Sequence, residues 1–184
     1  AQLKLNHFSH FIQLNQLAIH DDASHSLWIH KHLSSNKQAE DLIAILLKQA
    51  GKFKLTLNKI DQPSPLPPSS VQNFLKEDNE IGGIVISNHE KQYSNKFYNS
   101  FLDDYKNING SSENVTNHLA KVVKVVTASL YELLTGESLN SEEELVIDKV
   151  FITKLLDCYL NNSACDLFKY VSDPDNEFKG NQSI

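Results

Sequence analysis

The sequence contains no methionine and only two cysteines among its 184 residues. It also lacks any apolar run near the roughly 18 to 20 residues that a membrane-spanning helix requires. Its first residues do not have the charged, apolar and small-residue layout of a signal peptide. We therefore expect a soluble stretch with no membrane span of its own. Because it starts at Ala1 rather than at methionine, we also expect a processed or excised piece of a longer protein.

The charge balance argues against a surface that binds nucleic acid. There are 17 basic and 23 acidic residues, which give a net charge of -6, and the basic residues form no stripe that could follow a phosphate backbone. We expect no nucleic acid partner and a solvated acidic surface. The hydrophobic content of 40% is sufficient for one globular domain with a core.

Apolar periodicity predicts strands that alternate with helices. Alternation of period two, or a short apolar run, predicts strands at residues 8–18, 53–58 and 81–87. Helical spacing predicts helices at residues 38–50, 69–76, 113–135 and 148–160, the second capped by Ser69 or Ser70. The last predicted strand is almost continuously apolar, which is typical of a strand buried on both faces. The fold class is therefore α/β, with a mainly parallel sheet flanked by helices.

The predicted sheet is small for this fold class. Three strands are fewer than the mean of about five or six per sheet. We therefore expect residues 1–172 to form the C-terminal part of a larger domain. Residues 173–184 are polar and contain glycine, and we expect them to form a flexible tail.

The two cysteines, Cys158 and Cys165, lie on either side of a short polar segment, residues 161–163. Such a segment favours a turn, and a disulfide across it would pin that turn rather than hold the whole domain, because the closed loop is short. The alternative is two unpaired thiols, one of them buried. A zinc site is disfavoured because zinc normally takes four ligands and no histidine lies at finger spacing.

Four asparagines begin an N-glycosylation sequon: Asn109, Asn114, Asn161 and Asn181. Two or three would arise by chance in an asparagine-rich chain of this length, so four support a secretory location without deciding it. With the expected disulfide they favour an oxidising, extracellular or lumenal compartment.

No catalytic constellation emerges from the residues alone. Eight histidines suggest three candidate groups: His7 with His10, His30 with His32, and His89 beside Asn88. None has a carboxylate at ligand spacing, so surface or packing histidines are the better interpretation. The adjacent Asp103 and Asp104 are interpreted as solvated charges at a helix start. There is no nucleophile elbow, phosphate-binding glycine loop or Cys–His pair.

Four sequence blocks carry a family resemblance: LPPSS at 66–70, VQNFL at 71–75, GIVISNH at 83–89 and NKFYNS at 95–100. Together they resemble the nicastrin family. The resemblance covers residues 8–165 and is densest over 66–109. It implies a fold like that of the zinc aminopeptidases and the transferrin receptor, without peptidase activity.

The resemblance also implies that two metal-ligand positions have been lost. In the active zinc aminopeptidases similar to this family, an acidic ligand stands where this sequence has Gln13, and a histidine stands where it has Asn99. Neutral amides do not supply the carboxylate or imidazole that catalytic zinc requires. We therefore expect no catalytic residues, no metal and no cofactor.

Function and partners follow from the resemblance as expectations. It implies a non-catalytic ectodomain region, extracellular or lumenal, of a single-pass membrane protein of the endoplasmic reticulum, Golgi, plasma membrane and endosomes. The implied partners are presenilin and the other membrane subunits of γ-secretase, and the implied substrates are type I membrane proteins such as Notch and the amyloid precursor protein. Two alternatives stay open. One is a fragment of an active zinc-dependent aminopeptidase, and the other is a transferrin-receptor-like receptor ectodomain.

Overall fold

A computed structural model describes residues 4–17, 26–32, 36–60, 64–92, 97–98, 100–104, 113–139 and 145–171. The strands are β1 (His10–Leu14), β2 (Ser26–Lys31), β3 (Thr56–Lys59) and β4 (Gly82–Ser87). The helices are a short 3-10 turn, η1 (Leu5–His7), and α1 (Lys37–Lys52), α2 (Val71–Glu77), α3 (Glu113–Thr135), α4 (Lys149–Leu160) and α5 (Asp166–Val171). α1 lies between β2 and β3 in the chain and α2 lies between β3 and β4, and this mixture of one sheet with flanking helices confirms the α/β class.

The four strands form one sheet in the order β1-β4-β2-β3. β1 runs parallel to β4 and β2 runs parallel to β3, whereas β2 and β4 are antiparallel. The sheet is thus mainly parallel, as predicted. In this register Gln13 on β1 lies opposite Val85, and Trp28 on β2 lies opposite Ser87.

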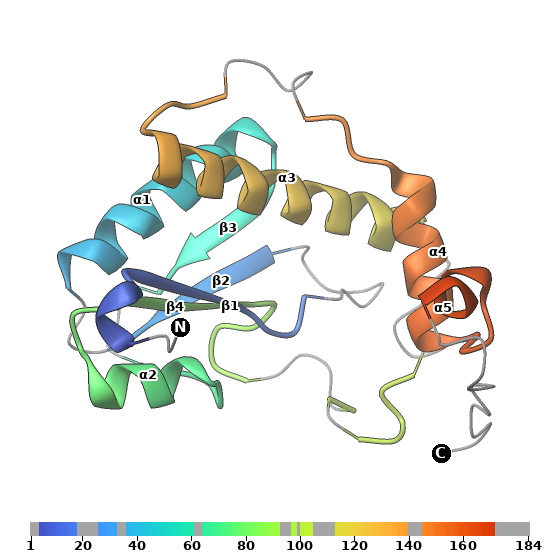
Figure 1. Ribbon diagram of the computed structural model, residues 1–184, viewed down its shortest axis with the longest axis horizontal. Coiled ribbons are helices and arrows are strands. Elements are labelled where there is room, and N and C mark those ends of the chain that lie inside the picture. The colour runs from blue at the N-terminus through green and yellow to red at the C-terminus, as the bar shows by residue number, and fades with distance from the viewer. Residues whose placement is uncertain are drawn as a thin grey trace.

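Helices cover both faces of the sheet. α1 and α3 lie together over one face, and α2 lies on the other (Figure 1). Two glycines at the start of β4 allow this close approach. A Cβ on Gly82 would lie 3.0 Å from the Gln38 carbonyl carbon of α1, and a Cβ on Gly83 would lie 2.8 Å from Val71 Cγ1 of α2. Side chains of β4 therefore point alternately towards α1 and towards α2.

The main core lies between the sheet and the α1–α3 pair. Ile84 and Ile86 of β4 are buried there together with apolar side chains of β2, α1 and α3, including Leu27, Ile29, Leu42, Leu46 and Val125. Burial of one such side chain contributes about 1.5–3 kcal/mol. A smaller cluster on the α2 face contains Leu66, Val71 and Val85. The prediction that the strand at 81–87 is buried on both faces is confirmed.

Strand β2 was not predicted from the sequence. Its inward residues Leu27 and Ile29 alternate with Trp28 and His30, but His30 is also buried, so the apolar alternation covers only three residues. Helix α5 was also missed, because six residues are too few to show helical periodicity.

Polar groups define the ends of several helices. Asn36 Oδ1 accepts from Ala39 N at the start of α1, and Asp148 Oδ1 accepts from Phe151 N at the start of α4. α3 ends before Gly136, which has a φ of 76° that favours glycine. Ser70 occupies the cap position of α2, but its side chain makes no capping bond to that helix. The predicted side-chain cap at Ser70 is therefore wrong.

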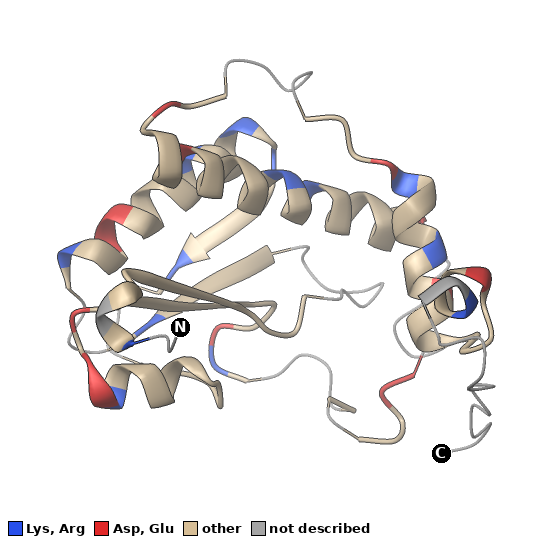
Figure 2. Ribbon diagram, in the orientation of Figure 1, with Lys and Arg blue, Asp and Glu red and all other residues tan. Residues whose placement is uncertain are grey.

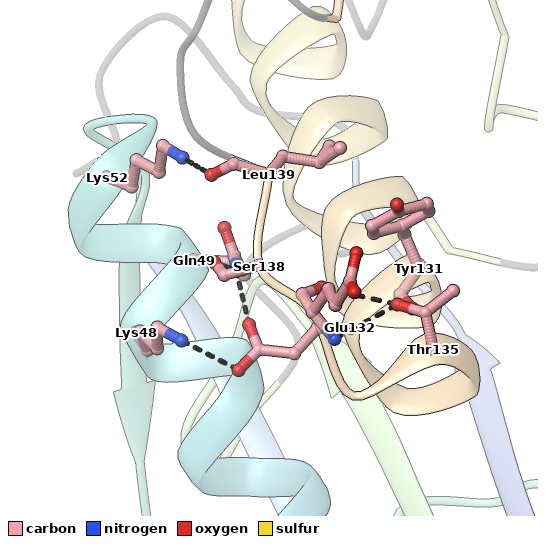
Figure 3. A network of polar contacts seen from close by, with 9 residues as sticks. Lys48, Gln49, Lys52, Tyr131, Glu132, Thr135, Ser138 and Leu139 are labelled. Carbon is pink, nitrogen blue, oxygen red and sulfur yellow. Dashed lines mark hydrogen bonds and ion pairs between the residues drawn. The ribbon is translucent and has the colours of Figure 1, made fainter.

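A polar clamp joins the C-terminal ends of α1 and α3 (Figure 3). Glu132 accepts from Lys48 Nζ at 2.7 Å and from Gln49 Nε2 at 2.6 Å. Gln49 also donates to Ser138 Oγ at 3.0 Å, and Lys52 Nζ donates to the Leu139 carbonyl. The Lys48 hydrogen bond is the main reason that the pKa of Glu132 is lowered. The clamp fixes the residues that follow α3 against α1.

α4 and α5 lie at one end of the molecule, away from the sheet (Figure 1). A disulfide joins Cys158 in the last turn of α4 to Cys165 just before α5. Lysines and acidic residues are interspersed along the described helices (Figure 2). Among the described residues, no helix is long and apolar enough to cross a bilayer. Asp103 and Asp104 end one of the described segments, and the residues that follow them lie outside the described part of the chain, so their place at a helix start stays a prediction.

Candidate functional site

Polar side chains gather on the α2 face of the sheet near the carboxyl ends of β1 and β4. Gln13, His30 and Ser87 come from three adjacent strands and share this face by the alternation of the pleat. The pairing of β1 with β4 continues one residue beyond β1, since Asn15 N donates to the Ile86 carbonyl at 2.9 Å. Ligands of α/β sheets bind at the carboxyl ends of strands, so this edge is the first place to look for a site.

The closest grouping is formed by His30, Ser87 and His89. His30 Nε2 lies 2.9 Å from Ser87 Oγ and 2.9 Å from the His89 carbonyl oxygen. Ser87 Oγ donates to that same carbonyl at 3.2 Å. The two imidazole rings lie 5.2 Å apart between their centroids. His30 and His89 are 4% and 6% exposed, and Ser87 is fully buried.

The hydrogen bonds fix the protonation state of His30. A carbonyl only accepts, so Nε2 must carry the hydrogen and Nδ1 is bare in the neutral ring. Nδ1 has no hydrogen-bond partner among the described residues. Burial lowers the pKa of His30, although the bond to the His89 carbonyl partly opposes this. Burial, with repulsion from His30, lowers the pKa of His89 to about 4. Both rings are neutral at physiological pH.

Gln13 serves the start of α2. Its Oε1 accepts from Ser70 Oγ at 2.9 Å and lies 3.4 Å from Val71 N. The amide oxygen thus satisfies backbone and hydroxyl donors at a helix start, a role that needs an acceptor and no charge. The same Ser70 hydroxyl that was predicted to cap α2 is used as the donor in this contact.

Asn99, the other predicted position of a lost ligand, lies outside the described residues. Its neighbour Tyr98 donates its hydroxyl to Asn15 Oδ1, two residues beyond Gln13. The segment before position 99 therefore passes beside the carboxyl end of β1. The structure brings that segment and Gln13 to the same edge of the sheet.

The three histidine groups considered in the sequence are interpreted as surface or packing residues. His7 and His32 are exposed, whereas His30 is buried against His89, a pairing that the sequence did not predict. Within the described ranges, no three His, Cys, Asp or Glu side chains are placed to hold a metal. A zinc site does not fit these residues, and we derive no metal chemistry from them. The alternation of Leu27 and Ile29 with Trp28 and His30 was the signal that could have revealed the strand that carries His30.

Two of the four sequons lie in the described chain. Asn114 is exposed in the first turn of α3, where Thr116 Oγ1 lies 3.3 Å from Thr153 Oγ1 of α4. Asn161 is exposed at the C-terminal end of α4, inside the loop closed by the disulfide. Asn109 and Asn181 lie outside the described residues. Occupancy of all four by glycans stays a prediction.

Comparison with known proteins gives consistent matches. The family model described as the nicastrin large lobe matches residues 1–131. Nicastrins of Mus musculus and Homo sapiens are each 34% identical over 200 residues, covering 93% of this chain and 28% of those proteins. Nicastrin of Arabidopsis thaliana is 28% identical over 148 residues, covering 77% of this chain and 21% of that protein. The chain thus spans less than a third of the relatives that it matches.

A solved structure agrees with the sequence matches. The crystal structure of the γ-secretase component nicastrin superposes with a TM-score of 0.68 at 27% identity, covering 90% of this chain and 27% of that chain. Sequence and structure comparisons therefore converge, and the chain belongs to the nicastrin family.

Proposed function

We propose that this chain is part of a nicastrin-type ectodomain that acts without catalysis as a structural and substrate-recognition region of a γ-secretase-like complex. Its partners are presenilin and the other membrane subunits of that protease. The substrates that it helps to select are type I membrane proteins, with Notch and the amyloid precursor protein as the expected examples. Family membership supports this proposal, because the related solved structure is itself a γ-secretase component.

The environment of Gln13 is the observation that carries the non-catalytic part of the proposal. In the active enzymes that the family resembles, this position holds an acidic zinc ligand. Here the amide oxygen accepts from Ser70 Oγ and faces Val71 N at the start of α2. A neutral amide is a poor zinc ligand. Gln13 therefore stabilises the start of α2 and does not bind a catalytic metal.

The histidine pair supports the same conclusion. A general base needs a pKa near the working pH and access to substrate. His30 and His89 are buried, and burial lowers the pKa of both rings, that of His89 to about 4. His30 also uses Nε2 to donate to the His89 carbonyl. These groups hold the carboxyl end of β4 in place and are unsuited to proton transfer.

An extracellular or lumenal location is also proposed. The disulfide between Cys158 and Cys165 is of a kind that persists in oxidising compartments. Asn114 and Asn161, the sequon asparagines within the described ranges, are both exposed. Both features favour the same side of the membrane.

The proposal can be tested in cells that lack their own nicastrin and receive the full-length protein. Gln13→Ala and Asn99→Ala should assemble with the membrane subunits and support substrate cleavage close to the wild-type level. Ile84→Asp should prevent maturation of the complex, because it places a charge in the core. An Asn99→Ala complex that assembled normally but lost all proteolysis would show that the site is catalytic.

A further inference from the structure

The sequon at the end of α4 lies inside the loop that the disulfide closes. Cys158 and Cys165 are seven positions apart, and Asn161, Asn162 and Ser163 lie between them. Both cysteines are buried, whereas the three sequon residues are exposed. Solvent exposure therefore does not limit glycosylation of this sequon, but its conformation can.

Hydrogen bonds hold that conformation, some of them within the closed loop and others to Asp157, which lies in α4 one residue before Cys158. Asn161 Nδ2, the nitrogen that would receive a glycan, donates to Asp157 Oδ1 at 2.9 Å. The backbone N–H groups of Asn161 and Asn162 both donate to the Asp157 carbonyl, at 2.9 and 2.8 Å. Cys165 N donates to the Asn162 carbonyl at 3.1 Å, and Ala164 N donates to Asn162 Oδ1 at 3.1 Å. Asn161 and Asn162 of the sequon are thus held in a turn.

The chemistry of N-glycosylation requires a different arrangement. The asparagine amide nitrogen attacks the anomeric carbon of an oligosaccharide carried on a lipid pyrophosphate. The new N–C bond forms, the sugar–phosphate bond breaks with its electrons leaving on the pyrophosphate, and the amide loses one proton. The sequon specifies both the asparagine and the hydroxyl residue, so the transferase must engage both side chains at once. A free chain can present both. In the folded chain the end of α4 holds the acceptor nitrogen against Asp157, and the closed loop keeps the residues after Asn161 folded back towards α4.

We propose that closure of the Cys158–Cys165 disulfide competes with glycosylation of Asn161. Asn161 is then modified only in molecules whose loop is still open when the transferase acts, and the mature protein is a mixture of modified and unmodified chains at this position. The proposal rests on the lumenal location given above. It adds an order of events, in which oxidation of the two thiols ends the opportunity for glycan transfer.

Asn114 provides the internal control. It is exposed in the first turn of α3, and no disulfide encloses its sequon, since the one disulfide of this chain lies in the α4–α5 region. Folding also restricts the Asn114 sequon, because Thr116 packs beside Thr153 of α4. Only Asn161 depends on the disulfide itself. A difference between the two positions therefore isolates the effect of loop closure.

The test measures glycan occupancy by peptide mapping of the full-length protein made in eukaryotic secretory cells. Wild type is compared with the double variant Cys158→Ser, Cys165→Ser, which cannot close the loop. Occupancy at Asn161 should be incomplete in wild type and should rise in the variant to the level of Asn114, while Asn114 stays unchanged. Because transfer is scored on the peptide, the variant need not reach its native fold. A pulse of dithiothreitol given to cells that make wild type should raise Asn161 occupancy in the same way.

Three results would overturn the proposal. One is equal Asn161 occupancy in wild type and variant, with Asn114 modified in both. Another is an Asn161 that stays unmodified in both proteins while Asn114 is occupied. The third is absence of glycans from all four sequons in both proteins, which would also overturn the lumenal location and thereby the proposed function. The state of Asn114 distinguishes the first two results from the third.

Discussion

Two regions of the molecule are stabilised in different ways. One is the α/β body, which is the sheet with α1, α2 and α3, and the other is the α4–α5 unit, residues 149–171. In the body, side chains of β2, β4, α1 and α3 form one continuous buried core. In the unit, α4 buries only Cys158, while Val150, Phe151 and Tyr159 are exposed. Burial of apolar area stabilises the body, whereas a covalent bond closes the unit. Changes that remove apolar contacts should therefore affect the body most, and changes that remove the covalent bond should affect the unit.

The largest effect is expected from Ile84→Asp. Ile84 is fully buried in the centre of the sheet, so a carboxylate there would lack both water and a partner. We expect a loss of more than about 4 kcal/mol, which would unfold the body. Leu130→Asp is the matched control. Leu130 is an apolar residue of α3, but its side chain is 40% exposed and should tolerate a charge much better. Circular dichroism and denaturant unfolding of both variants measure the difference.

Acid should weaken the body through the histidine pair. The pKa of His89 falls from 6.5 in the unfolded chain to about 4 in the folded chain, and that of His30 is also lowered. Between these values the unfolded chain binds the extra proton, so stability is complete above pH 6.5 and is lost as the pH falls towards 4. His89 alone contributes on the order of 2–3 kcal/mol to this loss.

Unfolding midpoints at about pH 7.5 and about pH 4.5 test this. His89→Gln should reduce the difference between the two midpoints. His7→Gln, at an exposed histidine, should leave it unchanged. Equal pH dependence in all three proteins would show that the buried pair does not control acid sensitivity.

Removing the disulfide should destabilise the α4–α5 unit. For a loop of this length, with a sequence separation of seven, the chain-entropy model gives about 2.5 kcal/mol. With Cys158→Ser and Cys165→Ser, amide hydrogen exchange should accelerate in residues 149–171 and stay unchanged in β4 and α1. Equal acceleration in the sheet would show that the body and the unit unfold together, and the contrast between them would then be wrong.

The smallest effect is expected from Gln13→Ala. It removes the acceptor for Ser70 Oγ and Val71 N, with a cost of about 1 kcal/mol. Gln92→Ala, at an exposed glutamine, is the control. Denaturant unfolding should separate the two variants. A Gln13→Ala protein as stable as the control would remove the structural role that we assign to this side chain.

Local sequence patterns predicted the body well. Leu42, Leu46 and Ala50 mark the buried face of α1, and Gly136 marks the end of α3, because helical spacing and a φ of 76° are local properties. The cysteine spacing around a turn predicted the disulfide partners for the same reason.

The features that the sequence did not reveal depend on contacts between distant residues. β2 is a strand because Leu27 and Ile29 meet a core supplied by α1, α3 and β4. His30 and His89 are 59 positions apart, and only the antiparallel pairing of β2 with β4 brings them together. Ser70 resembles a capping residue, yet its hydroxyl donates to Gln13 on β1. Each case requires the register of the sheet, which local patterns do not contain.

The central claim is that the protein acts without peptidase chemistry, and metal analysis of the purified full-length protein tests it most directly. The protein is equilibrated with zinc, freed of unbound metal, and assayed for bound zinc and for hydrolysis of aminoacyl substrates. We expect no more zinc than a control protein without a metal site retains, and no hydrolysis above background. Near-stoichiometric zinc together with aminopeptidase activity would contradict the account.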